Sequence, residues 1–146
     1  MLLQAILAAV LGTVAMTLSS TTEMQFRGRA ASTAPGRAFN KVLHVVGVPI
    51  LEGRALDILA TWTHWLYGAA WGVVFWLLAV IAGLPIVVAG VAFFLIVWLT
   101  EQVELPLLGI APPSWTWGLK ENAIDAGHHI AYAAGTVVGW ELLGLL

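Results

Sequence analysis

The chain has 146 residues, of which 60% are hydrophobic and only 10% are charged. A soluble domain carries charges on about a quarter of its residues, so six Lys and Arg with eight Asp and Glu cannot cover a globular surface. The net charge of −2 and the lack of a basic run disfavour a nucleic-acid partner. Because there is no cysteine, disulfides, thiolate metal sites and thiol catalysis are excluded. The composition predicts an all-α integral membrane protein surrounded by the lipid bilayer.

Four segments of the chain are long and apolar enough to cross a hydrocarbon layer, which takes about 20 residues of helix. They cover residues 2–22, 57–82, 86–105 and 123–145. The first segment lacks the cationic start and the cleavage site of a signal peptide, so we interpret it as a retained span. The short connection Gly83-Leu84-Pro85 makes the second and third spans antiparallel neighbours. We therefore expect a single membrane domain over residues 1–146, folded as a four-transmembrane-helix bundle.

The positive charges predict the orientation of this bundle. All six lie in the loops of residues 23–56 and 106–122, namely Arg27, Arg29, Arg37, Lys41 and Arg54 in the first and Lys120 in the second. The positive-inside rule places both loops in the cytoplasm and both termini outside. Trp62, Trp65, Trp98, Trp115 and Trp117 crowd the same side, as an interfacial aromatic belt would.

Both cytoplasmic loops contain candidate interfacial helices. In the first loop, after the Ser32–Gly36 interruption, apolar residues recur at helical spacing opposite polar ones. The apolar set is Phe39, Val42, Leu43 and Val46, and the polar set is Asn40, Lys41 and His44. This pattern predicts a short amphipathic helix over residues 37–46 that lies on the membrane surface. A second such stretch, with Trp115 and Trp117, follows Pro112-Pro113-Ser114.

A weak internal repeat predicts that the bundle consists of two similar helical hairpins. Spans two and four share a His-x-x-Tyr pattern, and spans one and three share a Thr-Glu pair. The matched residues are His64 and Tyr67 with His129 and Tyr132, and Thr22 and Glu23 with Thr100 and Glu101. Because the acids end the odd spans and the histidines begin the even ones, we expect all four to lie at one depth near the cytoplasmic end.

This placement makes Glu23, His64, Glu101 and His129 candidate metal ligands. A carboxylate at a helix C-terminus is destabilised by about 0.3–1 kcal/mol, and burial in hydrocarbon adds to that cost. A proton or a cation would relieve it. The side chains expected to surround these ligands, as outer partners that hydrogen-bond to them, are Tyr67, Tyr132, Glu104 and Asp125. Such a set could hold Zn, Fe or Mn, although the Glu-x-x-His pattern of di-iron bundles is absent.

Other interpretations of the same residues stay open. The four side chains could relay protons or ions across part of the membrane. Haem ligation by His64 and His129 ranks below the metal ion. A polar network that only fixes the helix register would make the chain a non-catalytic accessory or scaffold protein.

Gly68-x-x-x-Gly72 and Gly135-x-x-x-Gly139 predict close-packing seams, either inside the bundle or between protomers. No nucleophile–base pair, phosphate loop or dinucleotide fingerprint favours an enzyme.

Four short segments of the sequence are similar to segments of known proteins. They are Ser32-Thr33-Ala34-Pro35, His64-Trp65-Leu66-Tyr67-Gly68, Leu108-Gly109-Ile110-Ala111-Pro112-Pro113 and Asp125-Ala126-Gly127-His128-His129. The chain resembles small uncharacterised bacterial inner-membrane proteins of actinobacterial type and is more distantly similar to YagU-like proteins. The resemblance implies a four-helix protein of the bacterial plasma membrane and carries no activity with it. The leading hypothesis is a homo-oligomer that binds a metal ion or a proton at the Glu/His cluster, with transport as its candidate role.

Overall fold

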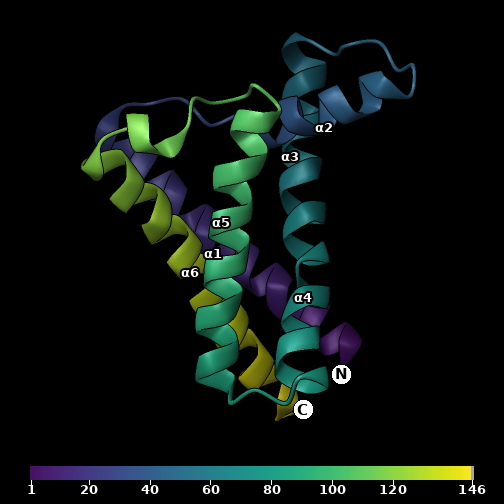
Figure 1. Ribbon diagram of the computed structural model, residues 1–146, viewed down its shortest axis with the longest axis vertical. Helices are drawn as coiled ribbons and strands as arrows, with labels where there is room; N and C mark the ends of the chain where they lie inside the picture. The colour runs from purple at the N-terminus through teal and green to yellow at the C-terminus, as the bar shows by residue number, and fades with distance from the viewer. Residues whose placement is uncertain (146) are drawn as a thin grey trace.

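A computed structural model describes residues 1–145 of the chain. Every regular element in this part is helical (Figure 1). The elements are α1 (Leu2–Arg27), α2 (Ala34–Val45), α3 (Gly53–Ala70), α4 (Gly72–Trp76), the π-helix η1 (Leu77–Ile81), α5 (Ile86–Leu107), the 3-10 helix η2 (Ser114–Thr116) and α6 (Leu119–Gly144). The all-α class predicted from the sequence is therefore confirmed for these residues.

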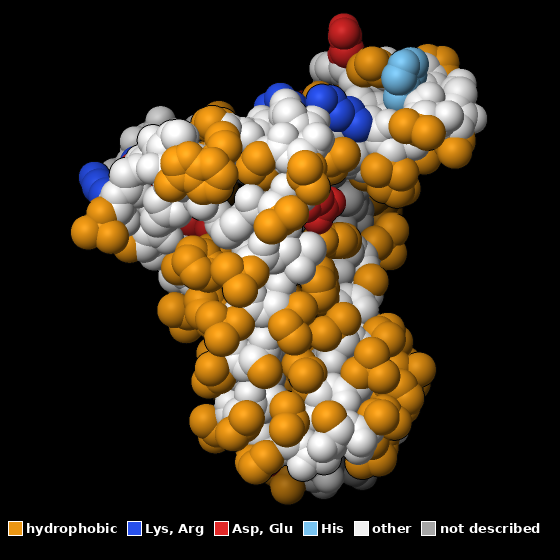
Figure 2. Space-filling view, in the orientation of Figure 1, with side chains coloured by type: hydrophobic (Ala, Val, Ile, Leu, Met, Phe, Trp, Pro, Cys, Tyr) orange, Lys and Arg blue, Asp and Glu red, His pale blue; other side chains and the backbone are white. Residues whose placement is uncertain are grey.

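Three helices are long and apolar enough to cross a membrane: Leu2–Arg27, Gly53–Ile81 and Ile86–Leu107. Their exposed faces are apolar, and hydrophobic side chains cover most of the lower part of the molecule in Figure 2. These features identify a membrane protein. Helix α6 occupies the fourth predicted span but is not among the three, because His128, His129 and Glu141 make it more polar.

The long helices alternate in direction. In Figure 1, α1 and α5 run toward the end that carries α2, whereas α3 and α6 run back toward the end that holds both termini. The turn between η1 and α5 lies at the terminal end, and Gly83 adopts a φ of 62° there, which glycine reaches without steric cost. Lys and Arg side chains gather at the opposite end (Figure 2).

Small residues bring α1 into close contact with α6 on one side and with α3 and α4 on the other. A Cβ atom at Gly12 would lie 2.1 Å from Thr136 Oγ1 and 2.5 Å from the Tyr132 carbonyl oxygen. A Cβ at Gly72 would lie 2.6 Å from the Ala5 carbonyl oxygen, and one at Gly135 would lie 2.7 Å from Ala15 Cβ. Both predicted glycine seams therefore pack against α1 within the chain.

An aromatic group ties α4, α5 and α6 together. The ring centroids of Phe75 and Phe93 are 5.4 Å apart, and Trp140 lies 5.8 Å from Phe75. Tyr132 stands 5.4 Å from Phe93. Phe75 and Phe93 are fully buried, and the two edge-on contacts of Phe75 add to the stability that burial provides.

The helix of the predicted second span continues from Gly53 to Ile81 but is irregular at Trp71, between α3 and α4. The Tyr132 hydroxyl on α6 donates a hydrogen bond to the Gly68 carbonyl oxygen at 2.6 Å. In a regular α-helix that oxygen accepts from the N–H of Gly72. The tyrosine therefore competes for this acceptor, which perturbs the helix at Trp71 without breaking it, since Trp71 keeps a helical φ of −60° and ψ of −19°.

Helix α2 begins at Ala34, earlier than the predicted start at residue 37. Pro35 lies in its first turn, where the missing N–H costs nothing. Asn40, predicted on the polar surface, is buried instead. Its side chain donates to the Leu51 carbonyl oxygen and accepts from the Leu51 N–H. Helix α2 is thus fixed to the following loop by both bonds.

The close approach at Gly12 yields the first prediction. Gly12→Ala should lower the free energy of unfolding by about 1–3 kcal/mol, because the new methyl group meets backbone as well as side-chain atoms. The matched control is Gly127→Ala in α6, where an added Cβ meets no heavy atom within 4 Å. That change should be neutral or stabilising. Thermal unfolding in detergent measures the stability of both variants. An unchanged midpoint for Gly12→Ala would contradict the close packing of α1 against α6 at Gly12.

Candidate functional site

Three side chains that can ligate a metal ion meet where α5 and α6 pack together. They are Glu101 from α5 and Asp125 and His129 from α6, and their ligand atoms all lie within 4.8 Å of one another. Within residues 1–145, no other group of His, Asp or Glu brings three such atoms together. Asp125 and His129 are one helical turn apart, so α6 presents both on one face. We call these three residues the acid–histidine cluster.

The hydrogen bonds of His129 fix its tautomer. Its Nδ1 atom lies 2.9 Å from the main-chain carbonyl oxygen of Asp125, which can only accept. Nδ1 therefore carries a proton. The other ring nitrogen, Nε2, lies 2.7 Å from Glu101 Oε2. This arrangement leaves Nε2 to bind a proton or a metal ion, and a hydrogen bond from the opposite nitrogen is the usual support of a metal-bound histidine.

Two neutral donors on α5 hold the Asp125 carboxylate. Trp98 Nε1 and Gln102 Nε2 both donate to Asp125 Oδ2, at 2.8 and 3.0 Å. The second oxygen, Oδ1, lies 3.8 Å from His129 Nδ1. Both donors lie on the face of α5 that carries Glu101. The carboxylate is thus oriented without any cationic partner.

The charge of the cluster is not balanced by nearby arginine or lysine. In the part of the chain that the structure describes, Arg and Lys form ion pairs only with Glu23 and Glu121. Glu101 and Asp125 share one imidazole, whose side chain is only 6% exposed. Even when His129 is protonated, its single positive charge neutralises only one of these two carboxylates. An uncompensated carboxylate at such a site costs several kcal/mol, so the cluster favours a proton or a cation.

Glu23, predicted as a ligand beside Glu101, lies in a different environment. It pairs with Arg27 at 2.9 Å and with Arg29 at 2.5 Å. Arg27 also reaches Glu121 at the start of α6 through two hydrogen bonds of 2.6 and 2.9 Å. Two arginines therefore satisfy Glu23, and no group of three ligands includes it among residues 1–145.

The other predicted residues surround a cavity beside the cluster. His64 Nε2 is 2.9 Å from Thr17 Oγ1. The Tyr67 hydroxyl donates to Glu104 Oε2 at 2.8 Å, and Tyr132 bonds to the backbone of α3. The structure thus brings together Glu101 and His129, adds Asp125 from the expected outer partners, and leaves His64 facing the same cavity with a hydroxyl partner.

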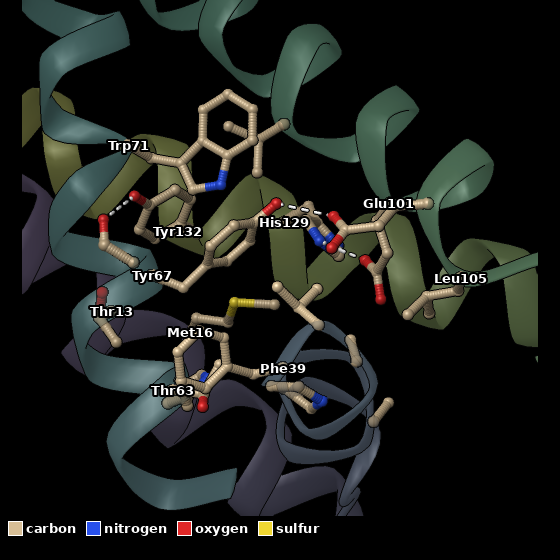
Figure 3. A pocket seen from close by; sticks show the side chains of 18 residues that line it. Thr13, Met16, Phe39, Thr63, Tyr67, Trp71, Glu101, Leu105, His129 and Tyr132 are labelled. Carbon is tan, nitrogen blue, oxygen red and sulfur yellow. Dashed lines mark hydrogen bonds and ion pairs between the residues drawn. The ribbon is translucent and has the colours of Figure 1, made fainter. Parts of the chain in front are cut away.

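The cavity has a volume of about 190 Å³ and lies between α1, α3, α5 and α6. Helix α2 covers it through Ala34, Pro35, Ala38, Phe39 and Val42. Figure 3 shows Tyr67 beside Glu101 and His129, with Trp71 and Phe39 on opposite sides of the space. Glu101 and His129 line the cavity, whereas Asp125 does not. A ligand in this space would therefore touch one side of the cluster.

The sequence interpretation omitted Trp98 and Gln102 as partners of Asp125. Trp98, Glu101, Gln102 and Leu105 follow the i, i+3, i+4, i+7 spacing of one helix face, so they share one face of α5. That spacing could have placed two neutral donors beside Glu101. The direction of Asp125 toward them depends on how α5 and α6 pack, which no local pattern reveals.

No protein-family model matches the chain, and no curated protein or solved structure matches it. The resemblance to YagU-like proteins accordingly stays a prediction.

The ion pairs at the ends of α1 and α6 yield the second prediction. Arg27 holds the pKa of the Glu121 carboxyl below its ordinary value. A lowered folded-state pKa stabilises the protein above the unfolded-state pKa, and this contribution is lost as the pH falls through the folded-state value. Glu121→Gln should therefore lower the melting temperature at neutral pH, and the difference from wild type should shrink in acid.

Thermal unfolding over a pH series tests this prediction. Glu141→Gln is the control, because Glu141 is exposed near the other end of α6. A deficit of Glu121→Gln that stays constant down to the acid limit of folding would contradict the pairing with Arg27.

Proposed function

We propose that this protein is a membrane-embedded cation-binding protein, with a divalent metal ion held by Glu101, Asp125 and His129. One observation carries the proposal. Three ligand atoms converge within 4.8 Å, and the two carboxylates have no arginine or lysine partner among the described residues. One histidine with two carboxylates suits zinc, iron(II) or manganese.

The Glu101–His129 pair fits a metal ion after a small adjustment, whereas Asp125 must turn toward Nε2 to join it, because its Oδ1 lies 3.8 Å from the protonated Nδ1. Bonds of about 2.1 Å in a tetrahedral site place two ligand atoms roughly 3.4 Å apart. His129 Nε2 and Glu101 Oε2 are 2.7 Å apart, so the pair must open by about 0.7 Å to admit the ion. Glu101 can move by side-chain rotation, since its side chain is 29% exposed. The cavity on the same side leaves room for a further ligand of the ion.

A proton bound between Glu101 and His129 is the second candidate, and the 2.7 Å contact favours it. Protonation of either group yields a hydrogen-bonded pair without any metal. In this case the site would be a proton relay, and His64 on the cavity wall would be the next titratable group. The two candidates differ in one measurable property, stoichiometric metal binding.

The proposal includes the number of membrane crossings and the orientation of the chain in the membrane. Four helices would cross the bacterial plasma membrane as two similar hairpins, with both termini extracytoplasmic and the cationic end cytoplasmic. The cluster would then lie toward the cytoplasmic side. Four helices alone rarely enclose a pore, so a role in transport would require a homo-oligomer. A scaffold whose cluster is only structural would bind no ion, and the experiment below separates that alternative.

Titration of the purified protein with Zn²⁺ and Mn²⁺ by calorimetry gives the third prediction. Wild type should bind one ion per chain, whereas Asp125→Asn and His129→Gln should bind it at least about tenfold more weakly. The matched controls are Asp57→Asn and His44→Gln, because both residues are exposed. These controls should bind as wild type does.

Two outcomes would contradict a metal site. One is the absence of heat of binding at saturating ion, which would leave the proton or structural alternative. The other is equal loss in the cluster variants and in the exposed controls. A pH titration then distinguishes the remaining alternatives, because a proton site changes the protonation of His129 whereas a structural network changes only the melting temperature.

A further inference from the structure

An open groove of about 730 Å³ lies on the outer surface, where α2 meets the last three turns of α5. Val42 of α2 forms one wall of the groove. Helix α5 forms its floor through Ile96, Leu99, Val103 and Leu107. All five side chains are exposed, so the groove presents apolar surface to whatever surrounds the protein.

The groove has the length of one leaflet of a bilayer. Ile96 and Leu107 are eleven residues apart on α5, which is roughly 16 Å along the helix axis. Half of the hydrocarbon layer of a membrane is about 15 Å thick. Thr100 also lines the groove, but its hydroxyl donates to the Ile96 carbonyl oxygen at 2.7 Å and is satisfied within α5. An acyl chain laid along α5 would therefore reach from the membrane surface to the middle of the bilayer.

A cation lies at the surface end of the groove. The Lys41 ammonium group donates to the main-chain carbonyl oxygen of Leu108, which also lines the groove. An ammonium group has three donors, so two remain for a ligand. Arg37 lies one helical turn before Lys41 on the same face of α2, and both residues are exposed.

Neither cation is paired with an acid. Within residues 1–145, the ion pairs made by arginine or lysine involve only Arg27 and Arg29. Figure 2 shows Lys and Arg side chains above hydrophobic ones at the end of the molecule that carries α2. An apolar groove that ends at two unpaired cations is complementary to an acyl chain that ends in a phosphate group.

Glu104 is the acidic residue of the groove wall. The Tyr67 hydroxyl donates to its Oε2 atom at 2.8 Å, which holds the carboxylate on the α3 side of α5. Glu104 precedes Leu108 by four residues, so it lies roughly 6 Å deeper along the helix axis. A phosphate group beside Lys41 would thus lie about one helical turn above this carboxylate.

Tertiary contacts hold α2 in place over the groove. Ala38 of α2 is buried together with Leu105 and Ile110 at the end of α5. A Cβ at Gly36 would lie 2.6 Å from Ala60 of α3, so the backbone of α2 lies directly against α3. The wall and the cations of the groove are therefore positioned before any ligand binds, which lowers the entropic cost of binding.

We propose that this groove binds one anionic phospholipid, with an acyl chain along α5 and the phosphate group at Lys41 and Arg37. Each cation near a membrane surface strengthens the binding of an anionic lipid about fivefold. The lipid site goes beyond the metal site and does not depend on it, because no residue of the acid–histidine cluster lines the groove.

Native mass spectrometry of the full chain in detergent tests the proposal. The probes are phosphatidylglycerol and phosphatidylcholine with identical acyl chains, so that only the headgroup charge differs. Wild type should retain one phosphatidylglycerol per chain. Its affinity for this lipid should exceed that for phosphatidylcholine roughly twentyfold, the combined effect of two cations.

Charge variants test the contacts with the phosphate group. Lys41→Gln and Arg37→Gln should each weaken phosphatidylglycerol binding about fivefold and leave phosphatidylcholine binding unchanged. Lys41→Arg should bind as wild type does, because it keeps the charge. The matched control is Lys120→Gln, since Lys120 is also exposed but lies at the start of α6. This control should not change lipid binding.

A second pair of variants tests the groove itself. Val103→Phe fills the floor of the groove and should weaken the binding of both lipids. Val91→Phe is the control, because Val91 is exposed on the same helix but does not line the groove. Thermal unfolding checks that each variant folds. Asp125→Asn should lose the metal ion and keep the lipid, which separates failure of this proposal from failure of the metal site.

Three results would overturn the lipid site. One is equal retention of the two lipids by wild type, which would mean that the groove holds only the surrounding bilayer lipid. Another is a loss in Lys120→Gln as large as that in Lys41→Gln. The third is wild-type lipid binding by folded Val103→Phe. Bound metal in wild type together with any of these results would leave the cation proposal intact.

Discussion

The close contact of α1 with its neighbours is the constraint on which the rest of the structure depends. Gly12, Gly72 and Gly135 allow backbones to approach to distances that a single methyl group would block. The approach of α6 brings Tyr132 to the backbone of α3, where its hydroxyl donates to the Gly68 carbonyl oxygen near Trp71. His129 is one turn from Tyr132 on the same face. The seam therefore positions both the histidine of the cluster and the indole of the cavity.

Four of the eight acids of this protein lie in two contrasting environments. Glu23 and Glu121 lie at the ends of helices and pair with arginines. Glu101 and Asp125 lie where only neutral donors and one histidine reach them. The first group is compensated within the chain, whereas the second requires a proton or an external cation. This difference locates the proposed function on α5 and α6 rather than at the cationic end.

The sequence predicted the helices because apolar length and the position of charges are local properties. It also singled out Glu101 and His129, since scarce ionisable residues in apolar segments are informative. Glu23 and Glu101 were grouped because both follow a threonine near the end of a span, but a local signal separates them. Arg27 lies four residues after Glu23 in the same helix, a spacing that predicts an ion pair, whereas Leu105 holds that position after Glu101. Only the contact of Arg29 with Glu23 depends on the turn that follows α1.

A structure of the protein with bound Mn²⁺, solved with anomalous diffraction, tests the central claim most directly. The account predicts one anomalous peak per chain between His129 Nε2 and the carboxylates of Glu101 and Asp125, with the His129–Glu101 contact wider than 2.7 Å. A peak beside Glu23, or none at saturating Mn²⁺ with the contact unchanged, would contradict it.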